Sequence, residues 1–370
     1  MSTTTSPVRI GIIGCGQIAQ QHLETYATIP GANVVACADI NPAAADGSAA
    51  KFGIPNVYYS AWEMLKRDDL DAIDVCLHNN LHVSGARAVL ESGRHCYCEK
   101  PMAGTYRDAL TMIETAKSLG LKLHIQLAML YTEDTRAARE LIEAGELGRI
   151  YHGRSMGFRR RGRPFVDGYG SQTFVQIANS GGGALYDMGV YHISQMLYLM
   201  GNPKATRITG KTYQELGMDE ARKLEAGYSV EELGLGFVRF ENNMSLDIIE
   251  AWAANLGGME SSCLLGTKGG VRLSPFGFFR SVGDLDLNAT VDLSAARYRW
   301  NKLRGEGDLY ANSQVHWIAA LQGRCDLYPT AEIGLNTMLI QEGIYLSERR
   351  GEEVSAEEVA SSSVSKALGL

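Results

Sequence analysis

The sequence lacks an excess of positive charge. Its 35 Lys and Arg residues are outnumbered by 42 Asp and Glu residues, which gives a formal net charge of −7 at pH 7. Such a chain has no basic field to hold nucleic acid or an anionic membrane. It also lacks an apolar run of roughly 18–20 residues, the length that spans a bilayer. Its opening residues, MSTTTSPVR, contain no apolar core of the kind found in signal peptides. We therefore expect a cytoplasmic protein that binds neither nucleic acid nor membranes.

Cysteine is scarce and odd in number, with seven in the chain. An odd set among mostly apolar neighbours indicates reduced thiols rather than disulfides. Cys96 and Cys98 stand two apart in GRHCYCEKPMA, so a strand places both on one face of a sheet. No second pair with the spacing of a zinc site follows them. We expect two core residues here and no metal site in the protein.

The first third of the chain alternates strand-like and helix-like segments. Mostly apolar runs at 8–16, 32–40 and 70–78 are separated by helical patterns. This alternation predicts a doubly wound parallel α/β sheet, with apolar strands because helices cover both faces. The chain of 370 residues is long enough for two domains at roughly 100–200 residues each. We expect the first to span residues 1–127.

The pattern changes in the rest of the chain. Long strand-like segments, among them RIYHGRSMGF and MSLDIIEAWAA, are joined by turns that contain Gly and Asn. Helical patterns interrupt and follow them. We expect residues 128–370 to form an α+β domain with a large, mostly antiparallel sheet.

A glycine-rich motif, GIIGCGQIA, links the first strand to the first helix. Gly14 would make the tight turn, Gly16 would let the backbone approach a pyrophosphate, and Ala19 would allow close helix–strand packing. Gln17 and Ile18 open the helix, whose N-terminus receives the pyrophosphate of a dinucleotide. We expect Gly14, Gly16, Gln17 and Ile18 to contact a cofactor. The alternative is a purely structural turn.

Asp39 ends the second strand, 25 residues after Gly14. A carboxylate at this place accepts hydrogen bonds from both ribose hydroxyls of an adenosine and repels a 2′-phosphate. No Arg or Lys follows it in DINPAA. The sequence therefore favours NAD over NADP as the cofactor.

Glu99, Lys100 and Pro101 follow another apolar strand at its carboxyl end, where open α/β sheets bind their ligands. A lysine there can reach a substrate hydroxyl beside a nicotinamide, and its charge favours a developing alkoxide. Pro101 restrains Lys100 to an extended conformation. We expect Lys100 to act in catalysis.

Five motifs occur in the order seen in the glucose–fructose oxidoreductase/inositol dehydrogenase (Gfo/Idh/MocA) family: GIIGCGQIA, EKPMA, ELIEAGELGRI, GGGALYDMGVYHI and GTKGGVRL. The chain resembles this family over nearly its whole length. The resemblance implies an N-terminal Rossmann domain and a C-terminal α+β domain with an open sheet. It implies NAD(P)-dependent oxidation or reduction of a sugar or cyclitol hydroxyl, and a homodimer or homotetramer built through the open sheet faces.

The resemblance also assigns roles to residues. Lys100 resembles the catalytic lysine of the family, and Asp187 resembles the aspartate that helps hold the substrate. Four residues later, at the acid/base position, this chain has Tyr191, followed by His192. Position favours Tyr191, which shares a helix face with Asp187. Chemistry favours His192, whose ordinary pKa lies near neutrality. Both remain candidates, and His192 and Asp187 are also expected substrate contacts.

Further cofactor contacts follow from the family pattern Thr-Pro-Asn-x-x-His, which lies beside the nicotinamide ribose. This chain keeps Asn80 and His82 but has His78-Asn79 in place of Thr-Pro, so His78 faces either a ligand or solvent. The resemblance implies the following contacts near the nicotinamide: Leu77, His78, Asn80, His82, Glu99, Lys100 and Gln126.

The segment RRRGRPFVDGYG, residues 159–170, is rich in arginine and aromatic residues. Arginine can bridge sugar hydroxyls, and aromatic rings cover the apolar faces of sugars. The substrate-binding candidates in this segment are Arg159, Arg161, Arg163 and Tyr169, together with Lys100. A solvated loop or an oligomer contact is the alternative.

These features together predict an NAD-dependent dehydrogenase or reductase that acts on a secondary hydroxyl of a sugar, glycoside or cyclitol. Two alternatives remain open from the sequence. One is a glycosidase that holds NAD tightly and oxidises its substrate transiently. The other is a sugar sensor that binds NAD without catalysis.

Overall fold

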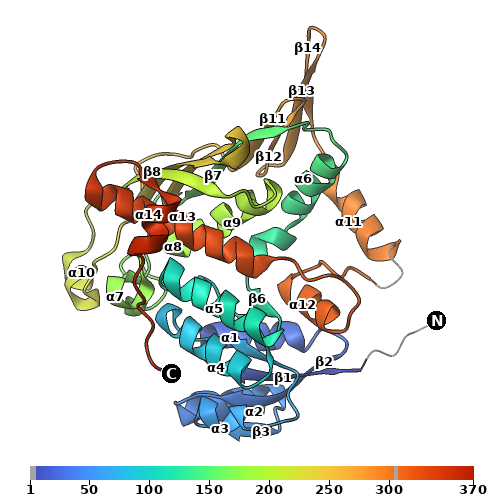
Figure 1. The fold of residues 1–370 in the computed structure, drawn as a ribbon, viewed down its shortest axis with the longest axis vertical. Helices are drawn as coiled ribbons and strands as arrows, with labels where there is room; N and C mark the ends of the chain where they lie inside the picture. The colour runs from blue at the N-terminus through green and yellow to red at the C-terminus, as the bar shows by residue number, and fades with distance from the viewer. Residues whose placement is uncertain (1–5, 304–306) are drawn as a thin grey trace. The chain divides into compact units, whose positions relative to one another are not determined.

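A six-stranded parallel sheet organises the first unit of the chain (Figure 1). The computed structural model describes residues 6–303 and 307–370. Unit 1 comprises residues 1–126, 309–332 and 365–370. Its strands are β1 (Val8–Ile13), β2 (Ala32–Ala38), β3 (Asn56–Tyr58), β4 (Ala72–Val75), β5 (His95–Cys98) and β6 (Leu123–Ile125). Its helices are α1 (Gln17–Tyr26), α2 (Pro42–Phe52), α3 (Ala61–Leu65), η1 (Asn79–Leu81), α4 (His82–Glu91), α5 (Tyr106–Leu119) and α12 (Ser313–Leu321).

The strand order of this sheet, β3-β2-β1-β4-β5-β6, reverses at β1. The strand pairings of this sheet in the described residues are all parallel, with β1 between β2 and β4. Ligands of open α/β sheets bind outside the carboxyl ends of the strands at such a reversal. The loops that follow β1, β4 and β5 therefore start from the place where a dinucleotide is expected.

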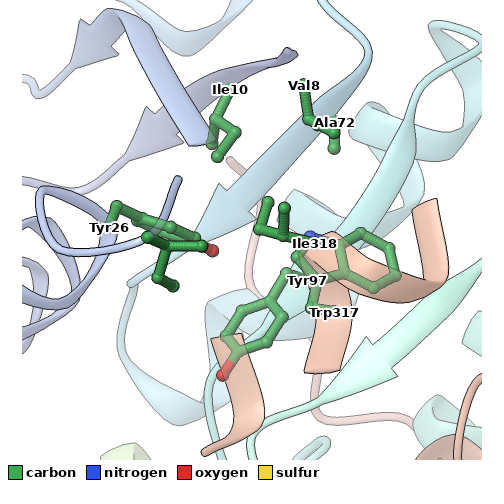
Figure 2. Close-up of a cluster of buried hydrophobic side chains, with 8 residues drawn as sticks. Val8, Ile10, Tyr26, Ala72, Tyr97, Trp317 and Ile318 are labelled. Atoms are coloured by element: carbon green, nitrogen blue, oxygen red, sulfur yellow. The ribbon is translucent and has the colours of Figure 1, made fainter. Parts of the chain in front are cut away.

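The core of unit 1 includes a helix from far along the chain (Figure 2). Trp317 and Ile318 of α12 pack with Ile10 of β1 and Tyr97 of β5, and all four are at most 1% exposed. The Tyr97 hydroxyl donates a hydrogen bond to Ser313 Oγ over 2.9 Å. Burial of these large rings holds α12 in unit 1, although α12 follows most of unit 2 in the sequence.

A nine-stranded sheet organises unit 2, residues 127–308 and 333–364. Its strands are β7 (Ile150–Phe158), β8 (Ala205–Tyr213), β9 (Leu233–Phe240), β10 (Ser245–Ala251), β11 (Cys263–Gly266), β12 (Gly270–Arg272), β13 (Gly277–Val282), β14 (Leu285–Ala289) and β15 (Val354–Ser355). Its helices are η2 (Ala128–Tyr131), α6 (Glu133–Glu143), η3 (Gln172–Val175), α7 (Ile177–Ser180), α8 (Ala184–Asp187), α9 (Gly189–Leu199), α10 (Glu220–Ala226), η4 (Glu241–Asn243), α11 (Leu293–Lys302) and α14 (Ala356–Ser362). The long helix α13 (Thr330–Arg350) starts in the first unit and lies mostly in the second.

The strand order of this sheet is β14-β13-β12-β11-β7-β10-β9-β8-β15, and only the central β7–β10 pair is parallel among the described pairings. Strands β13 and β14 extend as a hairpin beyond the rest of the sheet (Figure 1). The predicted fold class, a parallel α/β sheet followed by a mostly antiparallel α+β sheet, is confirmed.

Cys96 and Cys98 are fully buried, which confirms the prediction that they are core residues. All seven cysteines are free thiols. No helix in the described ranges, 6–303 and 307–370, is both long and apolar enough to cross a membrane.

Candidate active site

In the turn after β1, the backbone leaves no space for a side chain at Gly14. Gly14 has φ +89°, and a Cβ atom there would lie 2.3 Å from the Cys76 carbonyl oxygen. Only glycine therefore fits this turn. Gly16 caps the N-terminus of α1, and a Cβ built on it meets nothing within 4 Å. The start of α1, with its backbone N–H groups, is thus open on the Gly16 side to an anionic ligand.

Asp39 is held beside this turn by the backbone. Its Oδ2 accepts a hydrogen bond from Cys15 N–H at 2.7 Å, and its Oδ1 accepts one from Asn41 N–H at 2.8 Å. These two bonds fix the carboxylate at the end of β2. Each oxygen keeps a further lone pair for a hydroxyl donor. The position and the acceptor capacity suit the ribose of an adenosine.

The loops after β4 and β5 are joined by a buried histidine. The ring nitrogens of His82 lie 2.6 Å from the Pro101 carbonyl oxygen and 3.0 Å from the Leu77 carbonyl oxygen. Burial lowers the pKa of His82 below its ordinary value. Both nitrogens face the protein, so the ring has none to offer a cofactor. His82 supports the loops that carry Leu77 and Lys100.

The remaining predicted cofactor residues of unit 1 lie around these loops. His78 is exposed, Asn80 is buried in η1, and Lys100 is half-buried. Gln126 follows β6, where its N–H donates to the Cys98 carbonyl oxygen at 2.9 Å. Its Oε1 is buried and has no hydrogen-bond partner within the described residues. A buried acceptor without a partner is costly, so Gln126 is a suitable place for a ligand donor.

In unit 2, Asp187 ends the short helix α8 after the triple-glycine turn. A Cβ on Gly183 would lie 2.0 Å from the Glu231 carbonyl oxygen, so the turn requires glycine. The buried Glu231 carboxylate accepts hydrogen bonds from Gly183 N–H and Leu185 N–H at 2.9 Å each. Asp187 Oδ2 accepts a hydrogen bond from Trp252 Nε1–H at 3.1 Å. The carboxylate is therefore presented from a firmly held turn.

The helix is interrupted between Asp187 and the two acid/base candidates, Tyr191 and His192. Helix α8 ends at Asp187 and α9 begins at Gly189, with Met188 between them. The sequence predicted one continuous helix here. Tyr191 and His192 both lie in the first turn of α9 and are both half-buried.

His192 faces a buried carboxylate, Glu250, that is not among the residues predicted from the sequence. Its Nδ1 lies 2.9 Å from Oε2 of Glu250, which is 0% exposed. The other Glu250 oxygen accepts a hydrogen bond from Ser155 Oγ at 2.9 Å. His192 Nε2 makes no hydrogen bond within the described part of the chain. A ring held at one nitrogen and available at the other is the arrangement of an oriented general base.

The surroundings of His192 set its pKa. Burial lowers the pKa of His192, whereas the Glu250 carboxylate raises it, and the net direction is upward from the ordinary value. The Arg159 guanidinium opposes this rise. Glu250 stands out in the sequence as a charged residue in the apolar pattern SLDIIEAWAA. A carboxylate on the buried face of a strand was the signal that could have revealed it.

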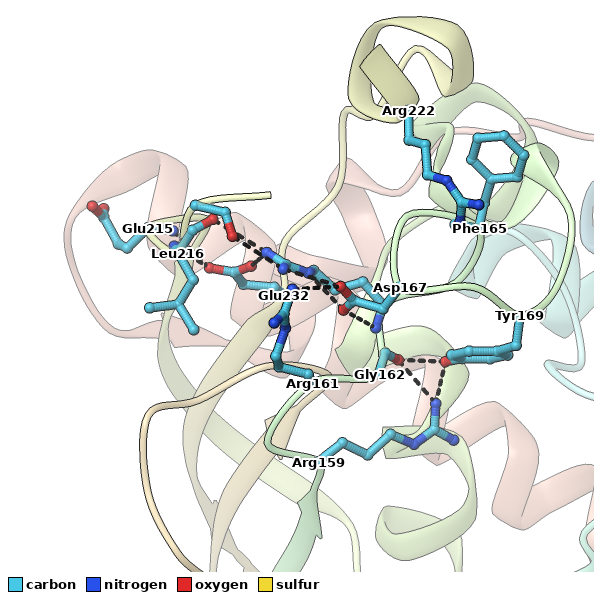
Figure 3. A network of polar contacts seen from close by, with 12 residues as sticks. Arg159, Arg161, Gly162, Phe165, Asp167, Tyr169, Glu215, Leu216, Arg222 and Glu232 are labelled. Carbon is cyan, nitrogen blue, oxygen red and sulfur yellow. Dashed lines mark hydrogen bonds and ion pairs between the residues drawn. The ribbon is translucent and has the colours of Figure 1, made fainter. Parts of the chain in front are cut away.

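The arginine-rich segment, residues 159–170, contains one buried arginine and several accessible side chains (Figure 3). Arg163 is 1% exposed, and its guanidinium lies 2.9 Å from both Asp167 Oδ2 and Glu232 Oε2. It also donates to the carbonyl oxygens of Leu216 and Gly217 at 3.2 Å each. Such an arginine has no donor left for a sugar. The expectation that Arg163 binds substrate is therefore wrong, because burial and two carboxylates engage it fully.

Arg159 and Tyr169 remain accessible and pair with each other. The Arg159 guanidinium lies 5.3 Å from the centroid of the Tyr169 ring and donates to its hydroxyl. Burial raises the pKa of Tyr169 to about 12, which keeps the hydroxyl neutral. Arg161 is largely exposed, 3.9 Å from Asp167. The charge of Arg159 lowers the pKa of His192, and the charge of Asp187 raises the pKa of Tyr169.

Gly157 of β7 lies directly against the His192–Glu250 pair. A Cβ at Gly157 would be 2.1 Å from Glu250 Oε2 and 2.7 Å from His192 Nδ1. We expect Gly157→Ala to displace the pair and lower kcat by about 10- to 100-fold, since misplacement by about 1 Å can cost that much. Steady-state kinetics measure this effect.

Gly153→Ala is the matched control, on the same strand and the same sheet face. Its Cβ would meet the ends of the flexible side chains Met200, Leu246 and Leu264. Both variants are expected to lose stability, but only Gly157→Ala loses turnover in its folded form. Equal kcat values in the two variants would contradict the role of the His192–Glu250 pair.

Two family descriptions match the chain. Residues 8–127 match "Oxidoreductase family, NAD-binding Rossmann fold", and residues 135–272 match "GFO/IDH/MocA C-terminal domain". The chain is 32% identical over 282 residues to a D-glucoside 3-dehydrogenase of Escherichia coli (strain K12), which covers 74% of this chain and 78% of that protein.

Solved structures share the fold over almost the full length. An oxidoreductase from Agrobacterium radiobacter in complex with NAD+, L-tartaric acid and magnesium has a TM-score of 0.78 at 18% identity, covering 95% of this chain and 99% of that one. The WlbA dehydrogenase from Bordetella pertussis in complex with NADH and UDP-GlcNAcA has a TM-score of 0.76 at 22% identity, covering 96% and 99%. At these identities the two structures establish the fold.

Proposed function

Because the chain belongs to the Gfo/Idh/MocA oxidoreductase family, we propose that it is a dehydrogenase that converts one secondary hydroxyl of a sugar, glycoside or cyclitol to a ketone. Its family and relatives make it an oxidoreductase that acts on CH–OH groups with NAD as the cofactor. The observation that carries the proposal is the His192–Glu250 pair, an oriented base in the same unit as Asp187.

The residues of unit 1 fit NAD. The Gly16 backbone is open where a pyrophosphate would lie, and Asp39 presents a fixed carboxylate for the ribose. Gln126 Oε1 is a buried acceptor that lacks a partner in the described residues. No lysine or arginine follows Asp39 in DINPAA, so a 2′-phosphate has no counter-charge there.

In the proposed reaction, His192 Nε2 takes the proton of the substrate hydroxyl, and Tyr191 is the alternative group for this step. Lys100 stabilises the negative charge that develops on the oxygen, and Asp187 and Arg159 hold neighbouring hydroxyls. NAD, when bound, supplies the acceptor for the hydride that leaves the carbon. His78 is a further proposed contact of the cofactor, and Tyr169 is a further proposed contact of the substrate.

The substrate class follows from the relative that acts on glucosides. We propose a D-glucoside or a related pyranoside, oxidised at C3, as the first candidate. The test is NADH formation at 340 nm across a panel of glucosides, free monosaccharides and cyclitols. Turnover of glucosides above the other classes supports the proposal. Turnover confined to cyclitols would replace the substrate class and keep the reaction. The comparisons do not support a redox-assisted glycosidase or a non-catalytic sensor.

We also propose that the protein acts as a homodimer or homotetramer built on the sheet of unit 2. The strands at one end of this sheet carry exposed apolar side chains, with Leu285 65%, Val282 46% and Leu265 39% exposed. Apolar surface of this kind is stabilised by a partner. Light scattering during size-exclusion chromatography is expected to give two or four times the 40.3 kDa chain mass. Val282→Glu is expected to shift the mass downward. A monomeric mass for the unchanged protein would contradict the assembly.

A further inference from the structure

Behind Lys100, unit 1 buries a charged network that the reaction described above does not use. His22 of α1 has its Nδ1 2.8 Å from Asp74 Oδ2 and its Nε2 2.8 Å from Glu99 Oε1. The three side chains are 3%, 0% and 7% exposed, respectively. Asp74 lies in β4 and Glu99 directly follows β5. One ring therefore joins helix α1 to two neighbouring strands of the sheet.

The geometry of this network restricts where its protons lie. A neutral imidazole has one N–H and can donate to only one acceptor, whereas both nitrogens of His22 face carboxylate oxygens. Burial lowers the pKa of His22, but Cys76 and Asp74 raise it well above its ordinary value. Burial raises the pKa of Glu99, but the hydrogen bond from His22 brings it below its ordinary value. The geometry and these pKa directions together favour an imidazolium that donates to both oxygens.

Glu99 connects the His22 ring to the backbone of Lys100. Its second oxygen, Oε2, accepts a hydrogen bond from the Lys100 backbone N–H at 3.0 Å. The Glu99 backbone N–H donates to the Val75 carbonyl oxygen at 3.0 Å. The Glu99 carboxylate is therefore bound on one side by His22 and on the other by the peptide of Lys100. Helix α1, which opens at the glycine turn, is connected to Lys100 through two hydrogen bonds.

The groups that face His22 leave little freedom for other arrangements. Cys76 Sγ lies 3.4 Å from its Nδ1, and the Tyr97 ring stands edge-on at 5.7 Å between centroids. Tyr26, Cys96 and Cys98 are further buried groups near these carboxylates, and burial raises the pKa of each. Lys100 and His82 act on the pKa of Glu99. Removing His22 would leave two buried carboxylates without their shared donor, which is strongly unfavourable.

We propose that His22 is a positioning residue, which holds the Glu99 carboxylate in place and through it sets the position of Lys100. The inference rests on the proposed role of Lys100 in the dehydrogenase. It adds that Glu99 serves as a connector between the dinucleotide-binding helix and the lysine, rather than as a contact of the cofactor.

Two conservative variants separate this role from a general contribution to stability. The asparagine amide of His22→Asn can occupy the place of Nδ1, which keeps a donor for Asp74 and removes the one for Glu99. The glutamine amide of His22→Gln can occupy the place of Nε2, which keeps the donor for Glu99 and removes the one for Asp74. Each variant loses one of two buried contacts of the same length, so both are expected to lower the melting temperature.

The expected kinetic results differ. His22→Asn is expected to lower kcat by about 10- to 100-fold, whereas His22→Gln retains kcat within about fivefold, because only the first releases Glu99. The dissociation constant of NAD is expected to change by less than about threefold in both, since the glycine turn is untouched. His124→Gln is the control, because His124 is equally buried in unit 1 and bonds to Ser313 and Thr330 instead. It is expected to lower stability without lowering kcat.

A second readout does not depend on turnover. The acylation rate of Lys100 by a small amine-reactive reagent, measured by mass spectrometry relative to the exposed Lys122, is expected to change in His22→Asn and to stay unchanged in His22→Gln. If the unaltered protein oxidises none of the tested substrates, the proposed function fails while this measurement still decides the role of His22. Equal effects of the two variants on kcat and on labelling would overturn the inference.

Metal analysis of the purified protein completes the test. Ligand atoms of His22, Asp74 and Cys76 lie within 4.8 Å of one another. One divalent ion bound per chain, lost in both His22 variants, would replace the hydrogen-bonded network by a metal site and overturn the inference. The expected result is a metal content far below one per chain.

Discussion

Replacing Lys100 by alanine is expected to lower kcat by about 100- to 1000-fold, the usual effect of removing a group that stabilises a developing oxyanion. The ammonium group is the positive charge that follows β5 at the carboxyl edge of the parallel sheet. Its backbone is tied to the buried Glu99, so the lysine starts from a fixed point. Steady-state kinetics with the best substrate from the glucoside panel measure the loss.

NAD affinity separates this effect from damage to the cofactor site. The glycine turn and Asp39 are untouched by the change, so the dissociation constant of NAD in Lys100→Ala is expected to stay within about threefold. Lys122→Ala removes an exposed lysine from the same unit and is expected to leave kcat unchanged. Full turnover in folded Lys100→Ala would exclude the lysine from the chemistry, whereas a parallel loss of NAD binding would make it a cofactor contact.

The features that the sequence predicted are those with local causes. The glycine turn depends on the positive φ of Gly14, +89°, which L side chains rarely adopt. The period of the apolar residues indicates a strand or a helix within about ten residues. The burial of Cys96 and Cys98 follows from the same pattern. For these features the nearest residues in the chain are enough.

The features that escaped prediction depend on partners far along the chain. Arg163 belongs to a segment rich in exposed arginines, and only the folded chain brings Glu232, 69 residues away, onto its guanidinium. Glu250 pairs with His192 across 58 residues, which no local spacing indicates. Likewise, the pattern of α12 predicts a helix, but it does not reveal that Trp317 packs in the core of unit 1.

His192→Asn is expected to lower kcat by about 100- to 1000-fold, the effect of removing a general base. The pH profile gives the sharper test. Oxidation requires a neutral His192, so kcat/KM is expected to fall as pH drops through the pKa of this residue. Since the Glu250 carboxylate outweighs burial and raises that pKa, the acid limb should lie above the pKa of an ordinary histidine. Rates across a pH series measure it.

Glu250→Gln keeps the shape of the partner and removes its charge. The burial of His192 and the nearby Arg159 then act alone, and both lower its pKa. The acid limb of kcat/KM is therefore expected to move to lower pH. Because Ser155 Oγ still donates to the amide oxygen, the amide N–H faces His192 Nδ1 and keeps the proton of the neutral ring on Nε2, so the limiting rate is also expected to fall. Tyr191→Phe is the control, because it removes the neighbouring hydroxyl and leaves the pair intact. An acid limb that stays in place in Glu250→Gln, together with a loss of about 100-fold or more in Tyr191→Phe, would assign the proton transfer to Tyr191.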